Sequence, residues 1–301
     1  LRSSSLQAVE FKGKVKSIEK SAFENTGLKA IALPPCEKLG ARAFANNYNL
    51  ADISFPDTEI PLILSDLFID CSSITEAVLP DWMKEVPVSI FQDCYSLKTV
   101  TFPLNLEIIR EEAFSGTALE LPEENSLPAS LREISTLAFN GVSTIGKIAL
   151  PASLEYISIR AFANCSNLQI SNFDQLSALK KVGEGAFMNC TWLTSIKFPA
   201  NLELVGASVT GYPYDNKTLG SFQGCANLTD VEFNPGVLLG VNCFAFSGIK
   251  EINWPEGMTI QQGAFHDCNN LSKVTIPGHV TKIPNDAFYY CCLLYTSDAA
   301  D

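Results

Sequence analysis

Apolar residues recur along the chain in one repeating frame, with polar residues between them. Over residues 186–199 the frame reads Ala-Phe-Met-Asn-Cys-Thr-Trp-Leu-Thr-Ser-Ile-Lys-Phe-Pro. After Phe187, a cysteine follows at the third position, apolar residues at the sixth, ninth and eleventh, and then a proline. The same frame, in places more loosely, surrounds the landmark residues Phe23, Phe44, Phe68, Phe91, Phe114, Phe139, Phe162, Phe187, Phe222, Phe244, Phe265 and Phe288. Their spacings, by subtraction, are 21, 24, 23, 23, 25, 23, 25, 35, 22, 21 and 23 residues.

A fixed period in the twenties is the sequence signature of a leucine-rich-repeat solenoid. We therefore predict a single solenoid domain over residues 1–291, made of about twelve repeats of 21–25 residues. In such a fold each repeat packs only on its neighbours. The expected architecture is a curved parallel β-sheet on the concave side, with short helical turns on the opposite side.

The pattern inside one repeat predicts its elements. Val100 faces inward and Thr101 outward, as in a short strand with period two. Pro103 ends this strand because it has no N–H to give to a ladder. A short apolar pair such as Leu106 and Ile109 should then line the interior. The following Ala-Phe-x-x-Cys segment places its Phe and Cys on one face of a tight helical turn.

Most cysteines recur at one position of the same frame, and this placement indicates whether they are free thiols or disulfides. A small, soft residue at equivalent positions of stacked repeats suits a buried column of free thiols. Disulfides would require the Cα atoms to lie within about 7 Å and the side chains to face one another, so we favour free thiols. The structural residues expected from the frame are Phe44, Phe68, Phe91, Phe162, Phe187, Phe265, Phe288, Cys71, Cys94, Cys165, Cys190, Cys225 and Cys268.

The largest departure from the frame is an insertion near residues 206–220, within the 35-residue step. Insertions in repeat proteins map to loops on one face, and loops on rigid scaffolds are common binding sites. Tyr212, Tyr214 and Asp215 are residues that a binding loop presents. The alternative interpretation, a tolerated insertion with no role, remains open.

Two further segments depart from the frame. Residues 119–127 are compressed, and residues 168–180 do not hold the usual spacing, which predicts a bulged strand there. The final decapeptide, residues 292–301, looks like the in-frame translation of a sequencing-library adapter. We expect it not to be native sequence, and leave it out of the predicted domain.

Composition excludes several classes of partner and chemistry. The formal charge of −12 argues against nucleic acid, whose binders need a basic face. No apolar run approaches the roughly 20 residues that cross a bilayer, so we expect no membrane insertion within this chain. The two histidines, His266 and His279, lie in no catalytic or metal-binding motif. We predict no enzymatic activity, no metal and no cofactor.

The outward positions of the strands are the candidate ligand-binding surface, because they line the concave sheet. Asp230, Glu232 and Glu251 should cluster on adjacent strands, where like charges side by side are destabilising. That cost suggests an acidic binding patch, and the alternative is an ordinary solvated sheet face. The candidate residues are Thr99, Thr101, Lys147, Ser195, Lys197, Asp230, Glu232, Glu251 and Asn253.

The repeat phrase Leu-Thr-Ser-Ile-Lys-Phe-Pro, with Ile-Pro-Asn-Asp-Ala-Phe-Tyr-Tyr-Cys later in the chain, resembles the BspA-like leucine-rich repeats. The likeness covers residues 6–291. The resemblance implies part of a secreted or cell-surface protein that adheres to host or microbial surfaces through a protein or glycoprotein ligand. The competing hypothesis is an intracellular interaction scaffold of the same fold. An upstream signal peptide or a downstream anchor would decide for the first.

Overall fold

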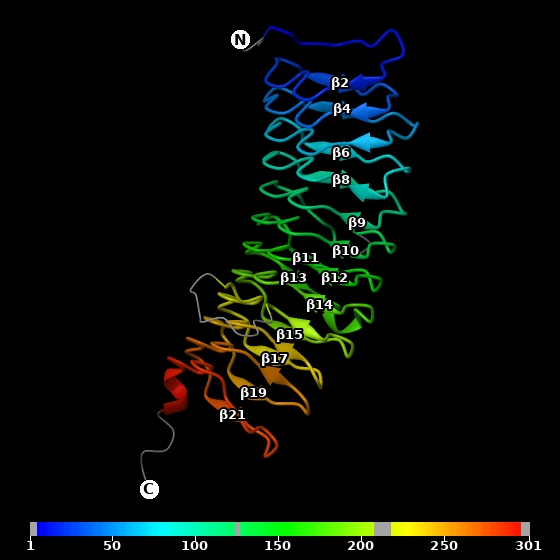
Figure 1. Ribbon diagram of the computed structural model, residues 1–301. Helices are drawn as coiled ribbons and strands as arrows, with labels where there is room; N and C mark the ends of the chain where they lie inside the picture. Colours follow the sequence, from blue (N-terminus) through cyan, green and yellow to red (C-terminus); the bar gives the residue numbers. More distant parts are fainter. Residues whose placement is uncertain (1–4, 124–126, 208–217, 296–301) are drawn as a thin grey trace.

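The computed structural model describes residues 5–123, 127–207 and 218–295, in which the chain winds into a solenoid of stacked coils (Figure 1). The two chain termini lie at opposite ends of the stack, which bends along its length (Figure 1). The strands form two columns of parallel pairings that run along the stack. The prediction of a parallel-strand solenoid is thus confirmed.

The first column, here called the first ladder, contains the strands that the in-and-out alternation predicts. Its strands are β2 (Ala30–Ala32), β4 (Asp52–Ser54), β6 (Glu76–Val78), β8 (Thr99–Thr101), β11 (Lys147–Ile148), β13 (Gln169–Ile170), β15 (Ser195–Lys197), β17 (Asp230–Glu232), β19 (Glu251–Asn253) and β21 (Lys273–Thr275). In β15, Ile196 is buried while Ser195 and Lys197 are exposed. The strands hydrogen-bond in successive pairs, from β2 with β4 to β19 with β21. The alternation thus separates core residues from surface residues.

The second ladder is built from two-residue strands that include the second member of the expected apolar pair, as β9 includes Ile109 but not Leu106. Its two-residue strands are β1 (Ser17–Ile18), β3 (Lys38–Leu39), β5 (Leu62–Ile63), β7 (Glu85–Val86), β9 (Ile108–Ile109), β10 (Glu133–Ile134), β12 (Tyr156–Ile157), β14 (Lys181–Val182), β16 (Leu204–Val205), β18 (Leu238–Leu239) and β20 (Thr259–Ile260). The inner residues, such as Val86 and Ile109, are fully buried. Strands β7 to β20 form a continuous eight-stranded sheet, longer than any sheet of the first ladder.

The second ladder is interrupted between β5 and β7, where a proline replaces a hydrogen-bond donor. In the next coil the residue after the strand donates its N–H to the previous coil, as Arg110 N does to Val86 O at 3.1 Å. Pro87 holds the same position and has no N–H, so it cannot donate to Ile63 O. The first ladder is unpaired at this boundary too, because β4 and β6 belong to different sheets. Backbone bonds between the turns hold these coils together.

The Ala-Phe-x-x-Cys segments form tight turns rather than helices. The expected bond over three residues is present, since Cys71 N donates to Phe68 O at 3.1 Å. However, Asp66 and Asp70 on either side of the phenylalanine both have φ of 60°. A right-handed helix cannot continue through left-handed residues. Instead, Asp66 N donates across to Val88 O of the next coil at 3.0 Å, so the turns are themselves linked from coil to coil.

The landmark phenylalanines form one continuous stack through the core. Neighbouring ring centroids lie 5.0–5.9 Å apart, with ring planes within 25° of parallel. Stacked pairs of this kind add to the stabilisation that burial provides. Phe288 and Phe23 are partly exposed, and the ten phenylalanines between them are fully buried.

The cysteine column is a row of buried free thiols, as predicted. All ten cysteines are free, and nine are buried. Each column thiol donates to the carbonyl oxygen of a landmark phenylalanine in the preceding coil, as Cys94 does to Phe68 O at 3.1 Å. Burial raises the pKa of the Cys71, Cys165 and Cys225 thiols to about 12. These three thiols are therefore protonated and unreactive at neutral pH.

The irregular segment at 168–180 is not the bulged strand that the spacing predicted: the strand ends at Ile170, and β13 and β15 belong to different sheets. After β13 the chain enters the short 3-10 helix η1 (Phe173–Gln175). Asn172, just before it, bonds the backbone of the previous coil with its side chain: Leu150 N donates to Oδ1 at 2.9 Å, and Nδ2 donates to Leu150 O at 2.8 Å. The side-chain amide thus replaces a missing peptide group. In the described part of the chain, the other helical element is η2 (Cys292–Tyr295).

Candidate binding surface

The nine first-ladder residues chosen from the sequence all lie at exposed positions. In β17, for example, Asp230 and Glu232 are exposed on either side of the buried Val231. The alternation along each strand is the cause, since successive side chains leave opposite faces. The exposed candidates are Thr99, Thr101, Lys147, Ser195, Lys197, Asp230, Glu232, Glu251 and Asn253.

Four of these residues meet around one hollow. Strands β15 and β17 pair in register, so that Ser195 lies beside Asp230 and Lys197 beside Glu232. Together with the start of η1 they enclose a hollow of about 240 Å³. Its lining is Ile170, Ser171, Phe173, Ser195, Ile196, Lys197, Asp230 and Glu232. We call this the strand-face hollow.

The hollow exists because the chain leaves the ladder after β13. The strand ends at Ile170, and the chain turns into η1 instead of continuing beside β15. Phe173 is buried and packs edge-on against Phe187 of the core stack, with centroids 6.0 Å apart. The sequence signalled this place only through its irregular spacing, which did not identify Ser171 or Phe173 as lining residues.

Lysines on flanking strands offset the acidic cluster expected from the sequence. Lys197 Nζ lies 2.8 Å from Glu232 Oε1, and Lys273 Nζ lies 3.6 Å from Glu251 Oε2. The hydrogen bond and charge of Glu232 raise the pKa of Lys197. Exposed pairs of this kind stabilise weakly, but they reduce the repulsion between neighbouring carboxylates. No ion pair forms at Asp230 within the described residues, which leaves its carboxylate available at the rim of the strand-face hollow.

The remaining candidates lie apart from this hollow. Thr99 and Thr101 are on β8, where they pair with Glu76 and Val78 of β6. Lys147 on β11 forms an ion pair with Glu123, with 2.6 Å between Nζ and Oε1. On β19, Glu251 and Asn253 pair with Lys273 and Thr275 of β21. None of these five candidates lines the strand-face hollow at β15 and β17.

The candidate loop residues Tyr212, Tyr214 and Asp215 lie outside the described residues. The chain leaves the described part after residue 207, beyond β16, and returns at 218 before the Phe222 turn. The returning end is anchored on the preceding coil, since Leu219 N donates to Glu184 Oε1 at 2.9 Å. A binding role for this insertion stays a prediction.

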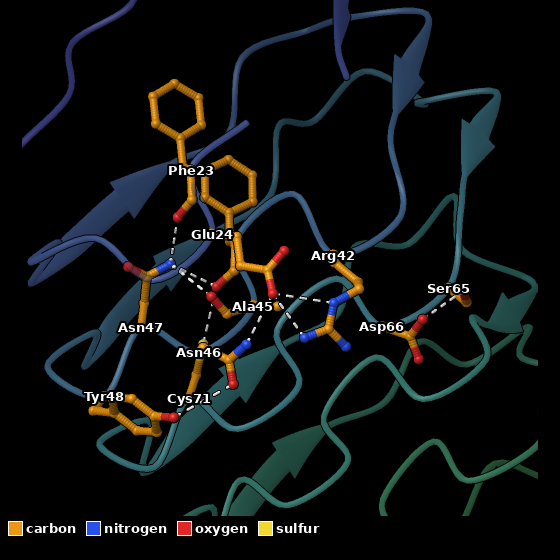
Figure 2. A network of polar contacts seen from close by, with 11 residues as sticks. Phe23, Glu24, Arg42, Ala45, Asn46, Asn47, Tyr48, Ser65, Asp66 and Cys71 are labelled. Atoms are coloured by element: carbon orange, nitrogen blue, oxygen red, sulfur yellow. Dashed lines mark hydrogen bonds and ion pairs between the residues drawn. The ribbon is translucent and has the colours of Figure 1, made fainter. Parts of the chain in front are cut away.

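Polar side chains on the turn side near the N-terminus stabilise the scaffold. Figure 2 shows Arg42 reaching the Glu24 carboxylate through Nε and Nη2, at 3.2 and 2.8 Å. Asn46 donates to the same carboxylate oxygen at 3.0 Å. The Arg42 hydrogen bond is the main cause of the lowered pKa of Glu24. Asn47 donates to Phe23 O at 2.8 Å, as a column thiol would (Figure 2).

A larger hollow that the sequence analysis did not anticipate lies at the break in the second ladder. It has a volume of about 530 Å³, and Ile63 and Pro87 stand in its lining. Trp82 lies at its margin and donates from Nε1 to Pro56 O at 2.9 Å, across the same coil boundary. The Val-Pro pair at residues 86–87 was the available signal, since it removes a ladder donor.

Residues 5–123, 127–207 and 218–295 contain no group of three or more His, Cys, Asp or Glu side chains placed to hold a metal ion. The same described residues include no helix with the length and apolarity needed to span a bilayer. His266 contacts Asp267 through Nδ1, and His279 stands in the lining of a separate hollow of about 540 Å³ near the C-terminal end.

Three comparisons place this architecture among known proteins. The chain matches a family model described as a BspA type leucine rich repeat region, in six copies, over residues 1–120, 122–211 and 216–297. No curated protein matches the chain. It resembles the crystal structure of a leucine rich cell surface protein from Faecalibacterium prausnitzii A2-165, with 26% identity and a TM-score of 0.52. That match covers 95% of this chain and 84% of the other.

Two more solved structures show the same fold. A leucine-rich repeat protein from Bacteroides ovatus ATCC 8483 matches with 25% identity and a TM-score of 0.61, over 97% of this chain. The chain spans 66% of that protein's length. The pneumococcal vaccine antigen PcpA matches with 16% identity and a TM-score of 0.55, over 88% of this chain and 68% of that one. At this identity the last match concerns the fold alone.

Proposed function

Because the chain belongs to the BspA-type leucine-rich-repeat family, we propose that it is a non-enzymatic protein-interaction module of a cell-surface or secreted protein. Its ligand is a protein or glycoprotein on a host or microbial surface. The similar protein from Faecalibacterium prausnitzii is described as a leucine rich cell surface protein, which supports this location. The role of the module is then adhesion.

The observation that carries the proposal is the strand-face hollow. Loops and edges of rigid scaffolds supply binding sites, and a hollow with convergent polar groups is where a partner's side chain can be held. Here Lys197 and Asp230 offer opposite charges, and Ser195 a hydroxyl, around one opening. The exposed strand residues of β8 and β11 are proposed as the periphery of the interface.

The test is a pair of charge reversals on the same ladder. We expect Asp230→Lys with Glu232→Lys to reduce retention on an immobilised epithelial matrix preparation at least tenfold, because both carboxylates at the hollow are lost. The matched control is Asp52→Lys with Glu76→Lys, which reverses two exposed carboxylates near the other end of the first ladder. Circular dichroism checks that both variants are folded.

Equal retention of the hollow variant and the unaltered chain would refute the hollow as the binding site. Equal losses in both double variants would show that general charge, rather than this site, governs binding. If the unaltered chain is not retained on the matrix preparation or on intact epithelial and bacterial cells, the adhesion proposal itself fails.

A second candidate function is an intracellular interaction scaffold. The observation that favours it is the set of ten free cysteines, since disulfides are rare where cellular thiols keep proteins reduced. Antibody staining of source cells separates the two locations. Staining of intact cells supports the surface module, and staining only after permeabilisation supports the scaffold.

A further inference from the structure

A second cluster of exposed side chains lies on the turn side of the last coils, away from the strand-face hollow. It consists of the exposed residues Phe246, Tyr289 and Tyr290 together with His266, which lies between them and is only 19% exposed, and we call it the aromatic cluster. The ring centroids of Phe246 and His266 are 5.7 Å apart, those of His266 and Tyr289 are 5.1 Å apart, and those of the two tyrosines are 4.2 Å apart. Phe246 is 50% exposed and Tyr290 56% exposed. Contiguous exposed aromatic surface of this kind marks interaction sites.

The backbone positions of Phe246 and Tyr290 show that local structure does not explain these residues. Both stand two residues after a landmark phenylalanine, with φ of 58° and 56°. Bulky side chains are strained in this left-handed region, which favours Gly, Asn and Asp. The equivalent residues of the other coils are Asn25, Asn46, Asp70, Asp93, Gly116, Gly141, Asn164, Asn189, Gly224 and Asp267. A residue that has a strained backbone conformation, and whose side chain does not pack in the core, suggests a functional role.

Carboxylates border the aromatic cluster. Asp267 contacts His266, and Asp286 accepts a hydrogen bond from Gln262 Nε2 at 3.2 Å. The pKa of Tyr289 is raised, first by its hydrogen bond with Tyr290 and further by the charges of Asp286 and Asp267. Among the described residues, no lysine or arginine forms an ion pair with either aspartate. The border of the cluster is therefore acidic, and His266 is the one basic side chain of the described residues that contacts either aspartate.

The ring orientations decide which ligand fits. Neighbouring ring planes meet at 55°, 41° and 61°, so the cluster has no flat platform on which a sugar ring could lie. Rings facing in several directions suit a cation, which is attracted to the face of each one. The acidic border attracts the same charge. We propose that the aromatic cluster binds an arginine or lysine side chain from a basic segment of a partner protein.

The proposal does not depend on the strand-face hollow, because the two sites lie on different sides of the coil and use different residues. The net charge of −12 favours encounter with a basic partner in general. The aromatic cluster adds several ring faces to that charge. Binding there should therefore discriminate an arginine from its neutral isostere, rather than follow total charge alone.

The test uses a fluorescent Gly-Arg-Gly-Arg-Gly peptide and the same peptide with citrulline in place of arginine. We expect the arginine peptide to bind at least tenfold more tightly. The double variant Phe246→Asn, Tyr290→Asn should bind it at least fivefold more weakly and should melt at the same or a higher temperature, because asparagine suits the left-handed backbone. The matched control, Tyr48→Asn with Tyr95→Asn, removes exposed aromatics outside the cluster and should bind normally.

Three results would overturn the proposal. One is equal affinity for the arginine and citrulline peptides. Another is unchanged binding by the Phe246→Asn, Tyr290→Asn variant, which would leave only general charge attraction. The third is displacement of the peptide by a neutral oligosaccharide such as cellotetraose, which would make the cluster a sugar site.

Discussion

At the scale of single residues, the third position after each landmark phenylalanine is defined by the hydrogen bond it can donate. The Cys94 thiol bonds the phenylalanine carbonyl of the preceding coil, and the Asn47 amide does the same. Thr117 uses its hydroxyl to satisfy Phe114 O at 2.9 Å within its own coil. The following coil can therefore carry Val142, whose side chain has no hydrogen-bond donor. The carbonyl oxygen of the landmark phenylalanine must accept a hydrogen bond, and a cysteine thiol is one of several groups that can donate it.

The buried thiols predict how stability depends on pH. In the folded protein the pKa of Cys71, Cys165 and Cys225 is about 12, above the ordinary value of 9.0. Their contribution is complete below about pH 9 and is lost as the pH rises towards 12, because the unfolded chain then releases protons that the folded chain keeps. We expect a loss of about 1.4 kcal/mol per thiol at pH 10, measured by urea unfolding at pH 7.5 and 10.

The control for this prediction replaces the three thiols with serine, which keeps a donor but does not ionise in this range. The free energy of unfolding of the triple variant should fall less between the two pH values than that of the unaltered chain. An identical fall in both proteins would mean that other groups govern the alkaline transition.

At the scale of elements, the second ladder ends where a proline removes a backbone N–H. Pro87 removes the donor that would join β7 to β5. The same pattern recurs at Ile283-Pro284, after β20, the last strand of the second ladder. Proline thus does more than end the strands of the first ladder, as the sequence suggested. It also sets where the second ladder stops, and a hollow opens beside each of these two prolines.

Hydrogen exchange should report the break at Pro87. In the next coil, Glu107 N and Ile108 N both donate to Lys84 O, at 2.7 and 3.3 Å. The equivalent amides of Lys84 and Glu85 face Pro61 across the break, where β5 and β7 are unpaired. We expect the Lys84 and Glu85 amides to exchange at least tenfold faster than those of Glu107 and Ile108.

The variant Pro87→Ala supplies the missing N–H and tests whether the proline causes the break in the second ladder. It should slow exchange at Lys84 and Glu85 if the absent donor is what opens the ladder. Fast exchange that persists in the variant would show that packing around the hollow, not the proline, keeps the strands apart.

At the scale of the whole molecule, the solenoid is held together by contacts between neighbouring coils. The phenylalanine stack, the thiol column and the turn bonds all join one coil to the next. Stability in such an array approximates a sum of nearest-neighbour terms, so damage in the middle separates two halves that each retain their own contacts. The centre of the stack is therefore the place where one substitution tests the cooperativity of the whole.

Phe162→Ala is the corresponding prediction. Phe162 is fully buried and stacks on Phe139 and Phe187, with centroids 5.2 and 5.6 Å away. We expect the substitution to cost about 3–5 kcal/mol of unfolding free energy and to turn a single urea transition into two. The exposed Tyr48→Ala variant should change the unfolding free energy by less than about 0.5 kcal/mol.

A single transition with an unchanged midpoint in Phe162→Ala would contradict the nearest-neighbour description. A single transition at a lower midpoint would mean that the array remains cooperative across its centre. Either result would separate this molecule from the expected behaviour of a stacked-repeat solenoid.

The sequence by itself determined the repeat frame and the features that can be read from one position of that frame. The period, the inward and outward positions of the strands, the structural role of the landmark phenylalanines and the free state of the thiols all follow from one frame, because equivalent residues of stacked coils become neighbours. Four of the nine surface candidates also belong to one hollow, although the sequence did not indicate the hollow itself.

Only the tertiary structure decided what depends on unequal coils. Two-residue strands such as β9 are too short to show a period, so the second ladder became visible through its hydrogen bonds alone. The pairing of Glu232 with Lys197 depends on the register between coils on either side of an insertion. The hollow beside them forms because η1 bends the chain away from the ladder. Local departures of this kind have no counterpart in neighbouring repeats, and the repeat frame therefore carries no information about their shape.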